Sequence, residues 1–211
     1  KDFVVAHVYD KTGPLEAYAK QTQNGLMLGL EYATQGTMTV AGRKIRVIEK
    51  DNQGKPDVAR AQLASAYADD NADIAVGPTS SGVALAMLPI AEEYEKILLV
   101  EPAVADSITG EKWNKYIFRT GRNSSQDAIA NAVAFDQEGT SIAMLAQDYA
   151  FGRDGVAAHG REQCSALVSD AFERCPCNVG QRAAARQPGD GAPRIWLPVR
   201  CPQAGERGHH H

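Results

Sequence analysis

The stretch IAVGPTSSGVALAMLPIAEE, from Ile74 to Glu93, sets the pattern of this 211-residue chain. An apolar run ends at Gly77-Pro78, hydroxyl residues follow, and a helix-like stretch begins at Ser81. This order predicts a buried strand, a tight turn, and a helix whose first backbone N–H groups have no intrahelical partner. Such a helix start suits a carboxylate or a phosphate. The simpler alternative is that Ser80 or Ser81 only caps its own helix.

The same alternation of strand and helix runs through residues 1–158. A hairpin-like turn is expected at Ala41-Gly42, and Pro89 is expected to kink or restart the helix that contains it. The alternation predicts an α/β fold, a Rossmann-like lobe with a mostly parallel sheet and helices on both faces. Strands are expected at 3–9, within 38–51, and at 73–77, 97–102, 116–120 and 141–148, and helices at 16–33, 55–70, 81–95, 124–139 and 149–158.

The composition limits the classes of partner. The formal net charge is −4 and the pI is about 5.7, so a nucleic-acid partner is not expected, because phosphate binding needs a basic face. No apolar run approaches the roughly 20 residues of a membrane-spanning helix. The chain opens at Lys1 without Met, which fits a removed secretory signal, although a cloned fragment would look the same.

The motifs of common catalytic and cofactor sites are missing from residues 1–158. The sequence has neither G-x-G-x-x-G nor G-x-x-x-x-G-K-[ST], and GPTSSG is not G-x-S-x-G. His7 lies inside the first apolar strand and is expected to be a core or strand-end residue rather than a base for a serine. We therefore expect a binding protein with no catalytic residue, no metal site and no cofactor. An α/β hydrolytic enzyme with Ser80 or Ser81 as nucleophile is the alternative.

The composition changes at about residue 158. Residues 159–211 hold all four cysteines, seven arginines, no lysine and half of the ten prolines. Three explanations are open: a natural disordered extension, a small metal site using Cys175 and Cys177, or a tail read in an altered frame. Cys-Pro-Cys lacks the spacing of the usual C-x-x-C zinc knuckle. The tail is therefore expected to be disordered or frame-altered.

Several motifs occur in order along residues 1–158 at matching spacing. The chain resembles the type I periplasmic solute-binding proteins of ABC importers, in the branched-chain amino acid-binding (Leu/Ile/Val-binding) branch. The resemblance does not extend into the tail. It rests on TGPLEAYA, GRKIRVIEKDNQGKPDVA, VGPTSSGVALAMLPIAEE, VEPAVADSIT, YIFRTGRNSSQ and LAQDYAFGRDG.

The resemblance implies two Rossmann-like lobes that close on a small ligand. Residues 1–120 are then most of the first lobe, the chain crosses near Thr120-Gly121, residues 121–158 begin a second, truncated lobe, and 159–211 are the atypical tail. The implied function is the extracytoplasmic substrate-binding component of an ABC transporter for a small carboxylate or amino acid, aromatic or branched aliphatic. It is periplasmic and non-enzymatic, with the importer's membrane subunits as partners. The ligand-sensing domain of a receptor with this fold is a further alternative.

The resemblance also implies six ligand-binding residues. Members of this branch commonly carry Thr or Ser where Ala105 stands, and that hydroxyl helps to hold an ammonium group. Ala105 therefore favours an aromatic or branched aliphatic carboxylate without an α-amino group over the matching amino acid. The implied residues are Ser80 and Ser81 for the carboxylate, backbone groups of Ala103 and Ala105, Tyr18 as a pocket wall, and Phe151 from the second lobe.

Overall fold

The computed structural model describes residues 1–135, 142–166 and 194–199. These form two compact units, Lys1–Asn123 and Ser124–His211. The predicted crossing near Thr120-Gly121 falls close to this boundary, and the division into two lobes of a larger fold stays a prediction. Most of the tail predicted to be disordered or frame-altered, including Cys175 and Cys177, lies outside the described residues.

The first unit is built on a six-stranded sheet with the order β2-β3-β1-β4-β5-β6. All neighbouring pairs are parallel except β2 and β3, which form the antiparallel hairpin predicted at Ala41-Gly42. The predicted mostly parallel α/β sheet is therefore confirmed. The strands are β1 (Phe3–Tyr9), β2 (Thr39–Val40), β3 (Arg43–Asp51), β4 (Ile74–Val76), β5 (Ile97–Val100) and β6 (Ile117–Arg119).

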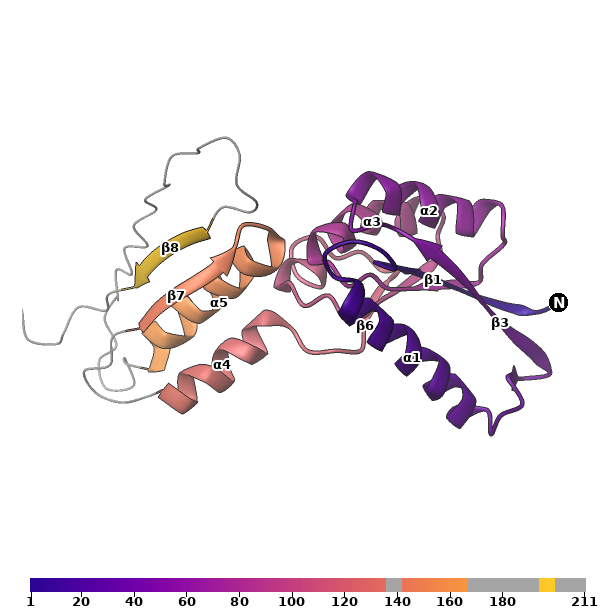
Figure 1. Cartoon of the computed structure of the whole chain (residues 1–211), viewed down its shortest axis with the longest axis horizontal. Coiled ribbons are helices and arrows are strands. Elements are labelled where there is room, and N and C mark those ends of the chain that lie inside the picture. Colours follow the sequence, from indigo (N-terminus) through magenta and orange to yellow (C-terminus); the bar gives the residue numbers. More distant parts are fainter. Residues whose placement is uncertain (136–141, 167–193, 200–211) are drawn as a thin grey trace, which may run out of the picture. The chain divides into compact units, whose positions relative to one another are not determined.

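Helices cover both faces of this sheet. Figure 1 shows α2 and α3 side by side on one face and α1 on the other. Pro56 stands in the first turn of α2, where a missing N–H leaves no hydrogen bond unmade. Of the two outcomes expected at Pro89, a restart of the helix is wrong, because α3 runs through it, and a kink stays a prediction. The helices are α1 (Glu16–Ala33), α2 (Pro56–Ala68), α3 (Ser81–Glu93) and the 3₁₀ turn η1 (Asp106–Ile108).

Strand β1 distributes its side chains between the two faces. Val4, Ala6 and Val8 pack in the main core, which also includes Leu63 of α2 and Met87 of α3. The alternate residues of β1 face the α1 side, where Val5 packs with partly buried apolar residues of that helix. Because the strand period is two, His7 and Tyr9 also belong to the α1 face, near the carboxyl end of the sheet.

The described residues of the second unit form two helices and a two-stranded antiparallel sheet. Both α5 and β8 place regular structure inside 159–211, which the sequence pattern did not indicate. Within the described parts of the chain, no helix is long and apolar enough to cross a membrane. The elements are α4 (Ser124–Phe135), β7 (Ile142–Gln147), α5 (Ala150–Ala166) and β8 (Arg194–Val199).

Gly77 forms the turn between β4 and α3. Its φ is +120°, and a Cβ atom added there would lie 2.2 Å from the carbonyl oxygen of Val8. Only glycine fits, both because of the backbone conformation and because the loop touches the backbone of the neighbouring strand. This close approach carries the β4–α3 loop over the end of β1.

Replacing Gly77 with alanine should lower the free energy of unfolding by about 2–3 kcal/mol, because strain at positive φ adds to the clash with Val8. Urea denaturation followed by circular dichroism measures the change. The control is Gly29→Ala in α1, where nothing lies within 4 Å of the added Cβ. This control should raise stability by up to about 1 kcal/mol. Equal stability of Gly77→Ala and the wild type would contradict the assignment.

Candidate functional site

The loop after β1 is tied to the loop after β4 by a buried carboxylate. Asp10 directly follows β1 and is 0% exposed. Its Oδ2 accepts the backbone N–H of Thr79 at 2.8 Å and that of Ser80 at 3.3 Å. Hydrogen bonds to an ionised acceptor are the stronger kind, so this carboxylate fixes the start of α3 against the end of β1.

The loop after β5 is held from two sides. Ser81, the first residue of α3, is 2% exposed, and its Oγ accepts the N–H of Ala105 at 3.2 Å. From β6, Arg119 donates to the carbonyl oxygens of Val104 at 2.9 Å and Ala105 at 2.7 Å. The Ser81 hydroxyl and the Arg119 guanidinium thus hold the same loop.

The first turn of α3 keeps unused donors at this edge. Across the part of the chain that the structure describes, the N–H groups of Ser81, Gly82 and Val83 donate no hydrogen bond, and Gly82 is partly exposed. Ser80 is the N-cap, half-buried, and its side chain caps nothing. A helix start with free N–H groups and a hydroxyl can accept an anion.

Four of the six predicted ligand-binding residues come together here. Ser80 lies on the loop after β4, Ser81 begins α3, and Ala103 and Ala105 lie on the loop after β5. Both backbone groups of Ala105 hold protein partners, and its expected contribution to a ligand stays a prediction.

The other two predicted residues lie elsewhere. Tyr18 stands on α1 with 64% of its surface exposed. Phe151 belongs to α5 of the second unit, where its ring centroid is 5.9 Å from that of Tyr149. Their proposed roles as pocket wall and closing aromatic stay predictions.

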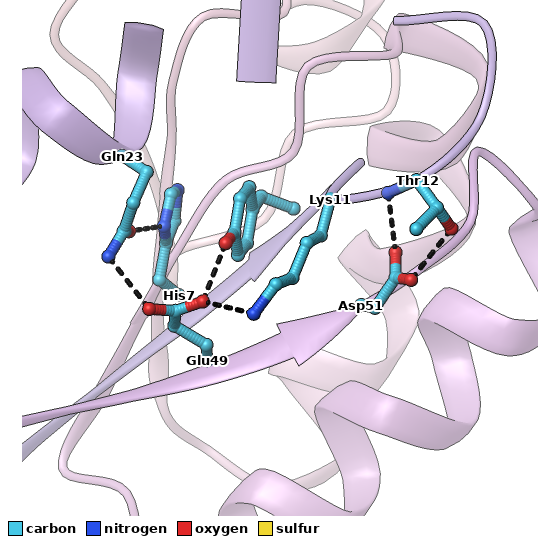
Figure 2. Close-up of polar contacts among 7 residues, drawn as sticks. His7, Lys11, Thr12, Gln23, Glu49 and Asp51 are labelled. Atoms are coloured by element: carbon cyan, nitrogen blue, oxygen red, sulfur yellow. Dashed lines mark hydrogen bonds and ion pairs between the residues drawn. The ribbon is translucent and has the colours of Figure 1, made fainter. Parts of the chain in front are cut away.

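A second polar cluster lies on the α1 face of β1 and β3 (Figure 2). Glu49 Oε2 accepts the Tyr9 hydroxyl at 2.6 Å and the Lys11 ammonium at 2.8 Å. Glu49 Oε1 accepts the side-chain amide of Gln23 at 3.1 Å, and Gln23 Oε1 bonds to Nδ1 of His7. One carboxylate thereby links α1, β1 and the β1–α1 loop.

The pKa values in this cluster follow from burial and pairing. Burial lowers the pKa of His7, which is 0% exposed and stacked on Tyr9 at 4.1 Å between ring centroids. Hydrogen bonds from Lys11 and Tyr9 lower the pKa of Glu49, and burial together with Glu49 raises the pKa of Tyr9. His7 is therefore neutral and Glu49 is ionised near neutral pH. The prediction that His7 is a core residue is confirmed.

Asp51 holds the same β1–α1 loop further along. Its carboxylate accepts the N–H of Thr12 at 3.2 Å and the Thr12 hydroxyl at 2.7 Å (Figure 2). Among the residues placed by the structure, no group of three or more His, Cys, Asp or Glu could hold a metal ion. The acidic residues whose contacts are given above bind protein donors.

Sequence reasoning missed Asp10 and Arg119. The available signal was an acidic residue directly after a buried strand, and a basic residue at the end of another. At the carboxyl edge of a parallel sheet such residues can reach neighbouring loops. The partners of Asp10 lie 69 and 70 residues away along the chain, so local patterns could not name them.

A family model described as "Periplasmic binding protein" matches residues 3–162. The chain is 30% identical over 148 residues to the chemotactic signal transduction system substrate-binding protein BasB of Halobacterium salinarum. That match covers 66% of this chain and 35% of BasB.

Two solved structures from Rhodopseudomonas palustris are also similar. An ABC-type branched-chain amino acid transporter protein of strain CGA009 is 70% identical, with a TM-score of 0.69. A solute binding protein of an ABC transporter from strain BisB5, in complex with 3,4-dihydroxybenzoic acid, is 27% identical, with a TM-score of 0.67. Each match covers 78% of this chain and 44% of the solved chain, so this chain spans less than half their length.

The free energy of unfolding should fall on acidification because His7 becomes protonated more readily in the unfolded chain. The pKa of His7 is lowered in the folded protein. Near and below the ordinary histidine pKa of about 6.5, His7 therefore binds more protons in the unfolded chain than in the folded protein. The contribution is present in full above that pH and is lost as the pH falls toward the folded-state value, at most about 1.4 kcal/mol per pH unit. Urea denaturation from about pH 8 to pH 5 measures the slope.

His7→Asn, which does not titrate, is the matched variant for this slope. Glu49 also has a lowered pKa, but its stabilisation is lost only below about pH 4.5. The variant should therefore lose most of the dependence between about pH 7 and pH 5. An identical slope in the variant and the wild type would show that another group carries it.

Proposed function

Because this chain belongs to the family of periplasmic binding proteins, we propose that it supplies a ligand-binding lobe of an ABC importer's extracytoplasmic substrate-binding component. The location is periplasmic, and the importer's membrane subunits are the protein partners. The similarity to BasB favours a second candidate, a substrate-binding protein that serves chemotactic signalling. Both candidates use the same edge of the sheet to hold the ligand.

The observation that carries the proposal is the convergence of loops at the carboxyl ends of β1, β4 and β5. In open parallel sheets small molecules bind outside these ends. Asp10, Ser81 and Arg119 fix the loops, while the first turn of α3 and the Ser80 hydroxyl remain for a ligand. A ligand carboxylate placed there accepts these donors.

The serine-hydrolase alternative lacks support in the side-chain contacts. His7 bonds to Gln23 and stacks on Tyr9, and His159 bonds to Asn131 and to the carbonyl oxygen of Gly155. A serine nucleophile needs a histidine or another base within hydrogen-bond reach. We therefore assign Ser80 and Ser81 to binding and loop support.

The ligand class follows from what the loops leave open. An ammonium group needs an acceptor, and Ala105 supplies no side-chain oxygen, while the Glu101 carboxylate is shared with the Thr120 hydroxyl, which donates to its Oε2 at 2.5 Å. A buried ammonium without an acceptor costs several kcal/mol. We therefore propose an aromatic or branched aliphatic carboxylate without an α-amino group. The 27%-identical relative in complex with 3,4-dihydroxybenzoic acid supports an aromatic acid.

Paired titration by calorimetry tests this ligand class. Phenylpropanoate and 4-methylpentanoate are compared with phenylalanine and leucine, on this chain and on the 70%-identical R. palustris protein. The acids should bind at least about tenfold more tightly than the matching amino acids, about 1.4 kcal/mol. Tenfold tighter binding of the amino acids would mean that an acid elsewhere holds the ammonium.

The two serines should behave differently on truncation. Ser80→Ala should weaken binding of a carboxylate by about 1.5–3 kcal/mol, the scale of a hydrogen bond to a charged group, with stability nearly unchanged. Ser81→Ala leaves the buried N–H of Ala105 unpaired, so the free energy of unfolding should fall by about 1–3 kcal/mol. Calorimetry and urea denaturation separate the two effects. A stable Ser81→Ala with intact binding would contradict the loop-support role.

A further inference from the structure

We propose that Asp10 is a positioning residue that sets the binding loop between β4 and α3, acting as an acceptor for that loop's backbone. The inference rests on the proposed function, since it assigns how the ligand-binding edge keeps its shape. Asp10 is not a ligand-binding residue in this account. Its carboxylate acts through Thr79 and Ser80, to which it is hydrogen-bonded.

The buried carboxylate of Asp10 serves as an acceptor for the loop between β4 and α3. Asp10 is 0% exposed, and its Oδ2 holds two successive N–H groups of one loop. A buried carboxylate is expensive unless donors surround it, so the pair of backbone bonds accounts for its place in the interior. Among the described residues its Oδ1 has no hydrogen-bond partner, and it lies 3.6 Å from the position of a Cβ on Gly54, within the neighbouring loop. The Asp10 side chain therefore lies where the loops after β1, β3 and β4 meet.

The hydrogen bonds from Thr79 and Ser80 to Asp10 lie directly before α3, and this position determines which N–H groups of the helix start stay available. Thr79 and Ser80 precede α3, so their N–H groups are outside the helix's own hydrogen bonds. With these two groups occupied by Asp10, the free donors begin at Ser81 and Gly82. Asp10 thus sets which N–H groups remain for a ligand.

The support that Asp10 gives to the β4–α3 loop extends to the loop after β5. Ser81 follows the two residues that Asp10 holds, and its Oγ accepts the N–H of Ala105. A shift of the loop would move that acceptor away from Ala105. Asp10, Ser81 and Ala105 therefore form one line of support from β1 through α3 to the loop after β5.

The experiment compares Asp10→Ala, which removes the acceptor, with Asp10→Asn, which keeps an acceptor oxygen and removes the charge. The control is Asp51→Ala, a carboxylate at the end of the neighbouring strand that holds Thr12 and not Thr79. Amide hydrogen exchange, measured by NMR on the whole ligand-free chain, reports on Thr79 and Ser80. Binding of 3,4-dihydroxybenzoate by calorimetry is the second readout.

We expect exchange at Thr79 and Ser80 to be at least about tenfold faster in Asp10→Ala, and within about threefold of wild type in Asp10→Asn and Asp51→Ala. If the wild type binds the acid, Asp10→Ala should weaken binding by at least about tenfold while Asp10→Asn stays within about threefold. Unchanged exchange in Asp10→Ala, or equal damage from Ala and Asn, overturns the acceptor role. Failure of wild type to bind any tested acid counts against the proposed function, while exchange still decides the role of Asp10.

Discussion

The close approach of Gly77 to the carbonyl oxygen of Val8 is the constraint on which the proposed ligand-binding edge depends. A side chain at Gly77 would push the β4–α3 loop away from β1, because its Cβ would lie 2.2 Å from that oxygen. Only with the loop so close can the Asp10 carboxylate, one residue after β1, reach the backbone of Thr79 and Ser80. The missing side chain and the buried charge therefore depend on each other.

The fold was largely predictable because its elements follow local rules. Strand β1 and helix α1 begin and end at the predicted residues, since an apolar β-branched run and an uninterrupted helical stretch are bounded by turn residues. The local rule that a proline restarts a helix fails at Pro89. Helix α3 continues through it and packs its apolar residues in the main core on both sides of the proline. Tertiary packing outweighed the cost of one missing hydrogen bond. Strand β8, which pairs with β7, was not predicted, because the composition of residues 159–211 favoured a tail without regular structure.

The helix start in the candidate site could be predicted from the sequence, but the contacts that hold its loops in place could not. Gly-Pro followed by hydroxyl residues indicated a helix start at Ser81, and the structure begins α3 there. The sequence did not indicate that Ser81 would be buried and hydrogen-bonded to Ala105. Contacts such as this and that of Asp10 join distant segments, and their geometry depends on how strands align in the sheet. A polar residue at a strand end shows where support can arise, but not what it supports.

The supporting residues also decide the chemistry that is left for a ligand. Asp10 occupies backbone donors, and Arg119 occupies backbone acceptors of the loop after β5. What remains on the first turn of α3 is a set of N–H donors beside the Ser80 hydroxyl. Donors grouped at the positive end of a helix select a ligand rich in acceptor oxygens. A carboxylate meets this requirement. The proposed preference for a carboxylate therefore follows from which backbone groups the loops already bind.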